Sequence, residues 1–260
     1  MEEKSMINIK GLHWSYGNEK VLDDIDIDFS KNNIYGIIGP NGSGKTTLLK
    51  NITRSLMPKN KSIYLFEKDI IAFSNRELAK IISYVPQNTS LEFEFSVMDI
   101  VLMGRTPYLK RLQSESFNDI EIAENSMKMT NTWKLRNKNI GNISGGERQR
   151  VIIARALSQQ SEIMLLDEPV SQLDIHHQVE ILNILKSLKL EKKVTVIMSL
   201  HDLNLASQYC DKLILMDEGK IVKKGFPKEV IKRENIEKVY GIKVDIIKNP
   251  INEKPHIILY

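Results

Sequence analysis

The nine residues at positions 39–47 constrain the fold of this chain more than any other part of it. The apolar run Ile34–Ile38 before them predicts a short strand, and Leu48–Ile52 after them predicts the first turns of a helix. A glycine loop between a strand and a helix N-terminus presents backbone N–H groups and the positive end of the helix dipole to an anion. The sequence therefore predicts an α/β fold with a phosphate-binding loop. The loop fits the pattern G-x-x-x-x-G-K followed by Ser or Thr in full, and it consists of Gly39, Pro40, Asn41, Gly42, Ser43, Gly44, Lys45, Thr46 and Thr47.

The side chains after the loop glycines indicate what the phosphates belong to. In this motif Lys45 reaches the β- and γ-phosphates of a nucleoside triphosphate, and the Thr46 hydroxyl binds Mg²⁺. A glycine-rich turn followed by chance by Lys and Thr is the alternative, and the complete pattern with the correct flanks disfavours it. We therefore expect the chain to bind a nucleoside triphosphate and Mg²⁺ through residues 39–47.

Composition and charge restrict the class of protein. Hydrophobic residues make up 42% of the 260 residues and charged residues 27%, which is typical of a globular protein with a buried core. The net charge of +4 comes from 37 basic and 33 acidic side chains. A surplus this small and this evenly spread disfavours nucleic acid as a partner. The single cysteine, Cys210, excludes an internal disulfide framework, and we expect it to be a small buried apolar residue.

The N-terminus and the hydropathy pattern bear on location. Residues Met1–Ser5 are polar and lack the apolar core of a secretory signal. No run approaches the roughly 18 apolar residues of a membrane span. We expect a cytoplasmic protein that reaches a membrane only through a partner.

Hydrophobic periodicity predicts the organisation of the chain. Alternation over Ile25–Phe29 predicts a half-buried strand. The apolar strands Ile163–Leu166 and Val194–Met198 flank a helical stretch, and this βαβ spacing favours a parallel sheet. We also expect a turn region between Gly11 and Gly17 and a hairpin at 213–222.

These elements predict a single domain over residues 1–260 with a nucleotide-binding core. The core has a mostly parallel sheet and an N-terminal antiparallel β region, and a helical subdomain is inserted into it. The expected boundaries are about 1–89 and 160–233 for the core, about 90–159 for the helical insertion, and about 234–260 for a β-like tail.

Two adjacent carboxylates follow the predicted strand Ile163–Leu166. Asp167 and Glu168 stand at the carboxyl end of a buried strand, where ligands bind in open α/β sheets. We expect Asp167 to hold Mg²⁺, through water, and Glu168 to orient or deprotonate the attacking water. A strand that simply ends in an acidic turn is the alternative, and the complete phosphate loop disfavours it.

Two consecutive glycines lie at the predicted N-terminus of a second helix. Ser144 and Glu147 form an S-x-x-E capping box for the helix that follows, which is a purely structural explanation. Gly145 and Gly146 between them are poor helix formers, and a plain cap has no need of them. A glycine-exposed helix N-terminus is also an anion site, so both interpretations can hold together.

Together these motifs resemble the ATP-binding cassette (ABC) ATPase family. The phosphate loop, Ser144–Glu147, the run Leu165–Pro169 and the downstream His201 follow the family's order along nearly the whole chain. The resemblance implies an α/β P-loop ATPase fold, ATP as the nucleotide, and hydrolysis. It also implies that two copies associate head to tail, with each ATP between the phosphate loop of one chain and the Ser144–Glu147 segment of the other.

The resemblance implies roles for further residues. Tyr16 matches the aromatic residue that stacks on adenine, with a structural tyrosine as the alternative. Gln87 matches the glutamine that reaches Mg²⁺ and the water and couples to the membrane partner. Asp174 closes the loop Ser171–Asp174, which matches the segment crossing the dimer interface, and His201 matches the γ-phosphate contact. A lone histidine at a strand end is usually structural, and the functional role of His201 depends on its strand lying beside the strand before Asp167.

Two neighbouring histidines receive no such role. His176 and His177 are adjacent in the chain and lack metal-ligand spacing to other residues. We expect both to be surface residues.

Three segments are similar to importer ATPases for iron–siderophore complexes, haem and vitamin B12: Val101–Tyr108, Ser171–Gln178 and His201–Ala206. This similarity implies transmembrane permease subunits and, through them, a substrate-binding protein, and a place on the cytoplasmic face of the membrane. It also implies that the segment Glu92–Leu112 receives a short permease helix. The expected contacts with this helix are Phe93, Phe95, Tyr108 and Leu109. For each of them an ordinary packing role is an equal alternative.

Two other functions stay open at this point. One is an ABC ATPase that acts on a soluble scaffold, as in iron–sulfur assembly or DNA repair, without a permease. Repair ATPases carry long coiled-coil insertions, and residues 90–159 lack sustained heptads. The other is an ATP-dependent switch that does not hydrolyse ATP, against which Glu168 and His201 argue.

Overall fold

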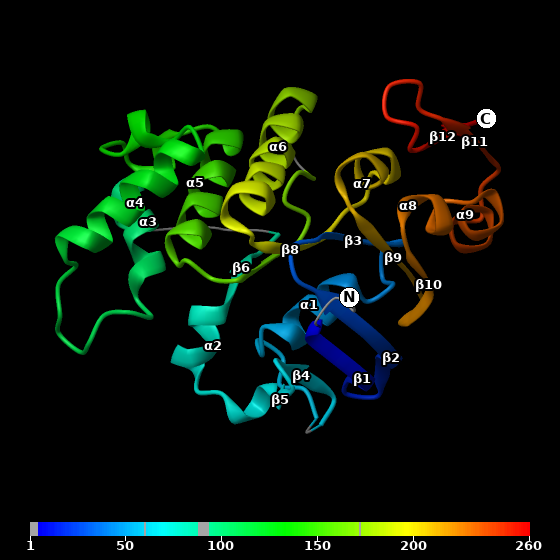
Figure 1. Ribbon diagram of the computed structural model, residues 1–260, viewed down its shortest axis with the longest axis horizontal. Coiled ribbons are helices and arrows are strands. Elements are labelled where there is room, and N and C mark those ends of the chain that lie inside the picture. The colour runs from blue at the N-terminus through cyan, green and yellow to red at the C-terminus, as the bar shows by residue number, and fades with distance from the viewer. Residues whose placement is uncertain (1–4, 60, 88–93, 172) are drawn as a thin grey trace. The chain divides into compact units, whose positions relative to one another are not determined.

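The computed structural model, drawn in Figure 1, describes residues 5–59, 61–87, 94–171 and 173–260. Its chain divides into two compact units. The first unit contains residues 1–73 and 195–260, and the second contains residues 74–194. The expected helical insertion lies within the second unit, together with strands on either side of it in the sequence. Its boundaries at about 90 and 159 stay a prediction.

The first unit contains an antiparallel sheet with the strand order β2-β1-β4-β5. Ile25, Ile27 and Phe29 on β2 are buried while the aspartates between them are exposed, so the expected half-buried strand is confirmed. The strands are β1 (Ser5–Tyr16), β2 (Glu19–Ser30), β4 (Ile63–Leu65) and β5 (Lys68–Asp69).

One expectation for this sheet is wrong. We expected a turn region between Gly11 and Gly17, and β1 instead runs through Gly11 and ends at Tyr16. Gly11 has φ +53°, and the β1–β2 register shifts between Ile9 and Leu12. The extra residue is thus absorbed by a bulge within the strand, which a glycine with positive φ permits. The turn itself is limited to Gly17 and the residue after it.

The parallel strands of the first unit centre on β3 (Ile34–Ile38). It pairs in parallel with β8 (Thr195–Ser199) on one side and with β9 (Lys212–Asp217) on the other. All five residues of β3 are buried, as expected for a central parallel strand that is covered on both faces. The expected hairpin is confirmed, because β10 (Lys220–Gly225) pairs antiparallel with β9.

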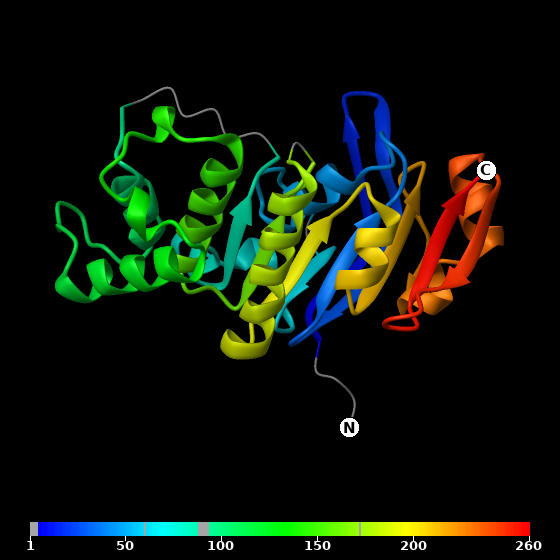
Figure 2. The same ribbon diagram turned by 90° about the horizontal axis from the view of Figure 1, so that it is seen from above.

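Helices and a terminal hairpin complete the first unit (Figure 2). The expectation of a β-like tail from about 234 is wrong for its first part, since residues 233–240 form a helix. Ile236 and Val239 are buried at helical spacing, so one face of this segment packs while the other stays polar. The elements are α1 (Lys45–Ile52), the 3-10 turn η1 (Ile70–Ala72), α7 (Leu203–Tyr209), α8 (Pro227–Val230), α9 (Arg233–Tyr240), β11 (Val244–Lys248) and β12 (Pro255–Leu259).

The second unit combines a parallel strand pair with helices. Strand β6 (Ile82–Val85) pairs in parallel with β7 (Ile163–Leu166), and Val85 lies opposite Leu166. Helices α3, α4 and α5 contact one another and form one cluster (Figure 1). The helical elements are α2 (Asn75–Ile81), α3 (Val97–Leu102), η2 (Met103–Arg105), α4 (Phe117–Met129), η3 (Trp133–Leu135), η4 (Ile140–Asn142), α5 (Gly145–Ser158) and α6 (Ile175–Lys192).

Serines start four of these helices in the same way. Ser74, Ser96, Ser116 and Ser144 each accept a hydrogen bond from the backbone N–H three residues later, and the acidic side chain at that position accepts one from the serine N–H. Each such reciprocal cap satisfies two otherwise unpaired N–H groups. The polar spacing S-x-x-D or S-x-x-E therefore sets the start of α2, α3, α4 and α5.

Candidate nucleotide site

The glycines of the phosphate loop adopt conformations that other residues avoid. Gly39, Gly42 and Gly44 have φ values of +151°, +82° and +97°. A Cβ on Gly39 would lie 2.2 Å from the Met216 carbonyl oxygen and 2.8 Å from Ser43 Oγ. Backbone conformation and close packing therefore both require glycine at this turn.

The interior of the loop fits a bound phosphate. The Lys45 ammonium is buried and donates to the carbonyl oxygens of Gly39 at 2.8 Å and Pro40 at 2.9 Å, so its charge lies within the curve of the loop. Ser43 Oγ is buried and has no hydrogen-bond partner among the described residues. Helix α1 starts directly after Gly44, which has no side chain to cap it. A buried cation, an unpaired hydroxyl and an uncapped helix N-terminus together suit phosphate oxygens.

His201 lies at the same sheet edge as the loop. The parallel β3–β8 register places Ile37 opposite Ser199, and Leu200 N donates to Ile37 O at 3.0 Å. Gly39 and His201 each follow two residues beyond that pair, so both emerge at the carboxyl edge of paired strands. The His201 side chain is exposed there. This position suits a contact with the terminal phosphate of a nucleotide held by the loop.

Tyr16 ends strand β1 and is 47% exposed. Its ring meets Trp14 edge to face, with the ring centroids 6.4 Å apart. Because about half of the side chain is open to solvent, a purely structural core role does not account for it. Stacking of Tyr16 on adenine stays a prediction.

The second unit holds the paired carboxylates at the end of β7. Asp167 is 1% exposed, and its N–H donates to Val85 O at 2.9 Å. Glu168 is half-buried with φ +49°, a left-handed conformation that a glutamate rarely adopts. The Gln87 amide donates to Glu168 Oε2. The structure therefore brings Gln87 and Glu168 together, because the parallel strands β6 and β7 end side by side.

Tyr84 is a residue of this region that the sequence did not single out. Burial, and then the Asp167 carboxylate, raise the pKa of the Tyr84 hydroxyl, so it stays protonated. No local motif marks a tyrosine on β6. Only the pairing of Tyr84 with Leu165 in the β6–β7 register places it near the end of β7.

The Ser144–Glu147 segment forms the expected capping box. Glu147 N donates to Ser144 Oγ at 3.2 Å, and Ser144 N donates to Glu147 Oε2 at 2.8 Å. The bond from the Ser144 N–H is the main reason that the pKa of Glu147 is lowered. A Cβ on Gly145 would meet nothing within 4 Å, so packing does not explain this glycine. Its role in an open anion site stays a prediction.

Asp174 caps helix α6, and His177 lies beside it. The Asp174 carboxylate accepts a hydrogen bond from His177 N at 3.0 Å, and both of its oxygens lie within 3.0 Å of His177 Nδ1. These bonds, the backbone one first, lower the pKa of Asp174. Gln172, two residues earlier in the sequence, lies outside the described residues. His176 is exposed as expected, whereas His177 is half-buried and held by Asp174.

Two arginines anchor the segment that follows α3. Arg105 is 3% exposed, and its guanidinium donates to Asp119 Oδ1 at 2.9 Å and to Ser158 O at 2.7 Å. Arg76 donates to the carbonyl oxygens of Pro107 at 2.8 Å and Leu109 at 2.9 Å. These bonds connect residues 105–109 to α4 and α5 through Arg105 and to α2 through Arg76.

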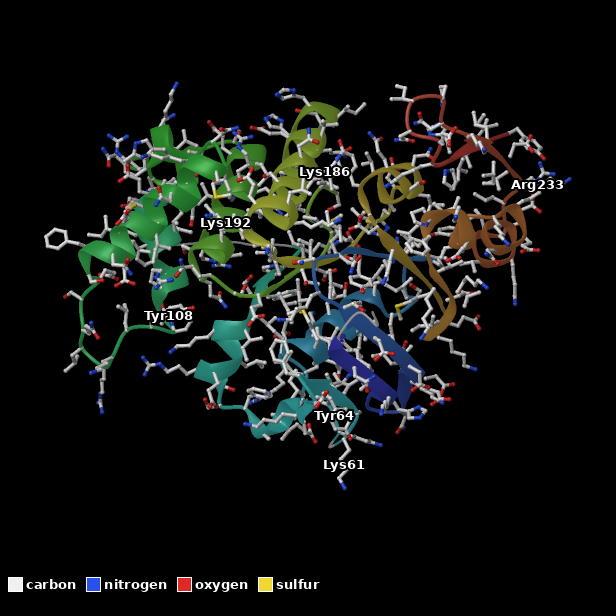
Figure 3. The ribbon with its side chains drawn as sticks, in the orientation of Figure 1. Lys61, Tyr64, Tyr108, Lys186, Lys192 and Arg233 are labelled. Carbon is white, nitrogen blue, oxygen red and sulfur yellow. The ribbon has the colours of Figure 1, made fainter. Side chains whose placement is uncertain are left out.

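The expected permease contacts differ in accessibility. Phe93 lies outside the described residues, and Phe95 is 36% exposed. Tyr108, labelled in Figure 3, is half-buried; its hydroxyl donates to Gln159 O at 3.0 Å, and its ring lies against the Arg105 guanidinium. Leu109 is also half-buried. Tyr108 therefore has a packing role in this unit.

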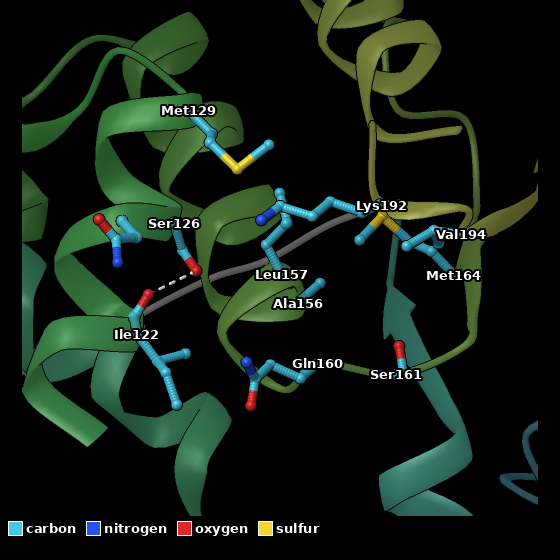
Figure 4. Close-up of a pocket in the computed structure, with 11 residues that line it drawn as sticks. Ile122, Ser126, Met129, Ala156, Leu157, Gln160, Ser161, Met164, Lys192 and Val194 are labelled. Carbon is cyan, nitrogen blue, oxygen red and sulfur yellow. Dashed lines mark hydrogen bonds between the residues drawn. The ribbon is translucent and has the colours of Figure 1, made fainter. Parts of the chain in front are cut away.

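A separate cavity of about 250 Å³ lies between α4, α5, the start of β7 and the end of α6 (Figure 4). Ile122, Met129, Leu157 and Met164 line it, and the Ser126 hydroxyl beside it donates to Ile122 O at 2.8 Å. Lys192 is the one cation among its described lining residues, and no predicted site residue is among them.

Among the residues that the structure describes, no helix is both long enough and apolar enough to cross a bilayer.

The chain is similar to known ATP-binding transport proteins. A family model described as ABC transporter matches residues 22–171. The chain is 35% identical over 257 residues to the ferric enterobactin transport ATP-binding protein of Escherichia coli, covering 98% of this chain and 95% of that protein. It is 34% identical over 251 residues to the probable siderophore transport system ATP-binding protein of Bacillus subtilis, covering 96% and 91%.

Solved structures agree in fold. An ABC transporter in an inward-facing conformation, assigned to the metal-chelate type, matches with a TM-score of 0.86 and 26% identity over 99% of this chain and 98% of that one. A dimeric ATP-binding cassette in a post-hydrolysis state, bound to ADP and Pi, matches with a TM-score of 0.73 and 27% identity over 85% and 98%.

Proposed function

The chain belongs to the ABC transporter family of ATP-binding proteins, and from that premise we propose that it is the ATPase motor of an importer for metal chelates of the iron–siderophore, haem or vitamin B12 kind. As a member of the family it binds ATP with Mg²⁺, hydrolyses it, forms a dimer and works with a transmembrane permease. The single observation that carries the choice of cargo is the near full-length similarity to ferric enterobactin and siderophore transport proteins. A substrate-binding protein and a position on the cytoplasmic face of the membrane complete the proposal.

The phosphate loop supplies the nucleotide-binding part of the mechanism. Lys45 neutralises phosphate charge from inside the loop, and the backbone N–H groups at the start of α1 bind phosphate oxygens. His201, at the same sheet edge, binds the terminal phosphate. Tyr16 stacks on adenine.

The second unit supplies the proposed hydrolytic groups. Glu168 orients or deprotonates the attacking water, and Gln87 holds the Glu168 carboxylate through its amide. Thr46, Gln87 and Asp167 are the proposed ligands of Mg²⁺, which when bound neutralises charge on the phosphates. The left-handed conformation of Glu168 is consistent with a functional residue, because such backbone strain persists where a site requires it.

The dimer couples the binding and hydrolysis of ATP to movement of the permease. The Ser144–Glu147 segment and Asp174 of one copy contact the ATP of the other, so ATP favours the closed dimer over the open one. Closure pulls on the permease, which docks at residues 92–112. Hydrolysis removes the bridging γ-phosphate and lets the dimer reopen.

A pull-down tests the importer proposal. Tagged Glu168→Gln protein with ATP and Mg²⁺ is used to capture partners from detergent-solubilised native membranes, which are identified by mass spectrometry, with Lys45→Ala protein as the matched control. We expect a polytopic permease and its substrate-binding protein with the first variant only. Recovery of a soluble scaffold without any membrane protein would contradict the importer proposal and favour an assembly ATPase.

A further inference from the structure

The Ser144–Glu147 segment and Asp174, which we propose to contact the ATP of the other copy, lie on either side of one side chain, that of His177. The Ser144–Glu147 segment starts α5, and Asp174 starts α6. The side chain of His177, in the first turn of α6, contacts Asp174 on one side and the start of α5 on the other. His177 is therefore placed to hold the start of α5 and the start of α6 in a fixed position relative to each other.

The contact with Asp174 is polar and directional. His177 Nδ1 lies 3.0 Å and 2.9 Å from the two Asp174 carboxylate oxygens. A carboxylate only accepts hydrogen bonds, so Nδ1 carries the proton and donates. The same carboxylate accepts from His177 N at 3.0 Å. These bonds fix the imidazole relative to the turn that contains Asp174.

The contact with α5 is steric. A Cβ placed on Gly146 would lie 2.8 Å from His177 Cδ2, 2.9 Å from Cγ and 3.2 Å from Nε2. The three nearest atoms it would meet all belong to the imidazole. The φ angle of Gly146 is not positive, so the ring, not the backbone conformation, accounts for the close fit at this glycine.

A second contact between the two helices lies about one turn further along each. Arg150, four residues after Gly146, donates to Glu180 Oε2 at 2.7 Å, and Glu180 stands three residues after His177. The Arg150–Glu180 pair fixes the bodies of α5 and α6 against each other. His177 acts at their starts, where the proposed nucleotide contacts lie.

We propose that His177 is a positioning residue that holds the Asp174 turn against Gly146 of the Ser144–Glu147 segment, so that both engage the partner's nucleotide as one unit. The inference rests on the proposed head-to-tail dimer. The imidazole does not itself touch ATP. Its donor nitrogen orients Asp174, and its carbon edge sets how closely α5 approaches.

Substitutions at position 177 separate these two contacts. The variant H177N keeps an amide donor in the place of Nδ1 and loses the ring edge, whereas H177A loses both. The neighbouring His176 is exposed, so H176A is the matched control. All variants are made in the Glu168→Gln background, and the ATP concentration for half-maximal dimer formation is measured by light scattering.

We expect H177A to raise that ATP concentration roughly five- to tenfold, since one hydrogen bond to a largely exposed carboxylate is lost. H177N should recover part of the effect and H176A should have none. ATP binding to the monomer, measured by titration calorimetry at concentrations where no dimer forms, should be unchanged in every variant. In the hydrolysing protein, H177A should raise KM more than it lowers kcat.

Gly146 offers an independent test that does not depend on the folding of H177A alone. G146A should weaken dimer formation because its methyl group meets the ring, and the double variant G146A/H177A should dimerise better than G146A. If H177A matches the parent and the double variant shows no relief, His177 has no positioning role. If the parent Glu168→Gln protein binds ATP but does not dimerise, the proposed head-to-tail function fails, and this inference fails with it.

Discussion

Replacing Arg105 by methionine should cost the protein about 3–5 kcal/mol of stability. Arg105 is 3% exposed, and its guanidinium donates to Asp119 Oδ1 at 2.9 Å, Ser158 O at 2.7 Å and Gln160 Oε1 at 3.1 Å. Methionine preserves the apolar stem but removes every one of these donors. Asp119, itself 5% exposed, keeps only its bonds from Ser116.

The magnitude follows from the charge that is left behind. Removing one partner of a buried ion pair leaves an uncompensated charge, and this is where the loss of about 3–5 kcal/mol arises. The loss should appear as a lower urea midpoint with an unchanged m-value. Arg111→Met is the matched control, because Arg111 is exposed and a surface change away from such contacts alters stability by no more than about 0.5 kcal/mol. A loss below about 1 kcal/mol for Arg105→Met would mean that Asp119 is not left as a buried, uncompensated charge.

The loss of stability in Arg105→Met should depend on pH, because it involves the ionised Asp119 carboxylate. Hydrogen bonds from Ser116 first, and the Arg105 guanidinium second, lower the pKa of Asp119 from 3.8 to about 2. The group therefore stabilises the folded state above about pH 4, and its contribution is lost as the pH falls from about 4 towards 2. Arg105→Met removes the second cause only. The difference in unfolding free energy between wild type and variant should thus narrow as the pH falls through this window.

Three further predictions concern the site and the core. Lys45→Ala should lose ATP binding in calorimetry, because the cation inside the phosphate loop disappears, and unchanged affinity would mean that the loop does not bind the phosphates. Ser144→Arg should abolish hydrolysis while the monomer still binds ATP; if the variant instead fails to fold, the segment acts only as a helix cap. Burial raises the pKa of the Cys210 thiol, so a thiol reagent at about pH 8 should modify the folded protein much more slowly than the urea-unfolded protein, and similar rates would contradict the buried position.

Local motifs were the part of this molecule that the sequence predicted well. The loop at 39–47 depends on its own glycines and on the strand and helix next to it, so its conformation could be inferred from residues adjacent in the chain. The Ser144–Glu147 cap is likewise contained within four residues. Strand alternation on β2 depends only on which face meets the core.

What the sequence did not predict depends on residues far apart in the chain. The bulge at Gly11 is set by pairing with β2, so β1 continues where a glycine suggested a turn. Helix α9 forms because Ile236 and Val239 find a surface to pack on, which a short polar segment does not reveal. The closeness of Gly146 to the His177 ring depends on how α5 and α6 pack, so the sequence around His177 did not predict it. Tyr84 lies near Asp167 because of the register in which β6 and β7 pair.

We propose that ATP holds two copies of this chain together through the Ser144–Glu147 segment. The mass of the Glu168→Gln protein in solution tests this proposal, measured by light scattering with ATP and Mg²⁺ and again with ADP and Mg²⁺. We expect the mass to double with ATP and to stay that of one chain with ADP. If the protein binds ATP at saturation and still has the mass of one chain, ATP does not join the two copies.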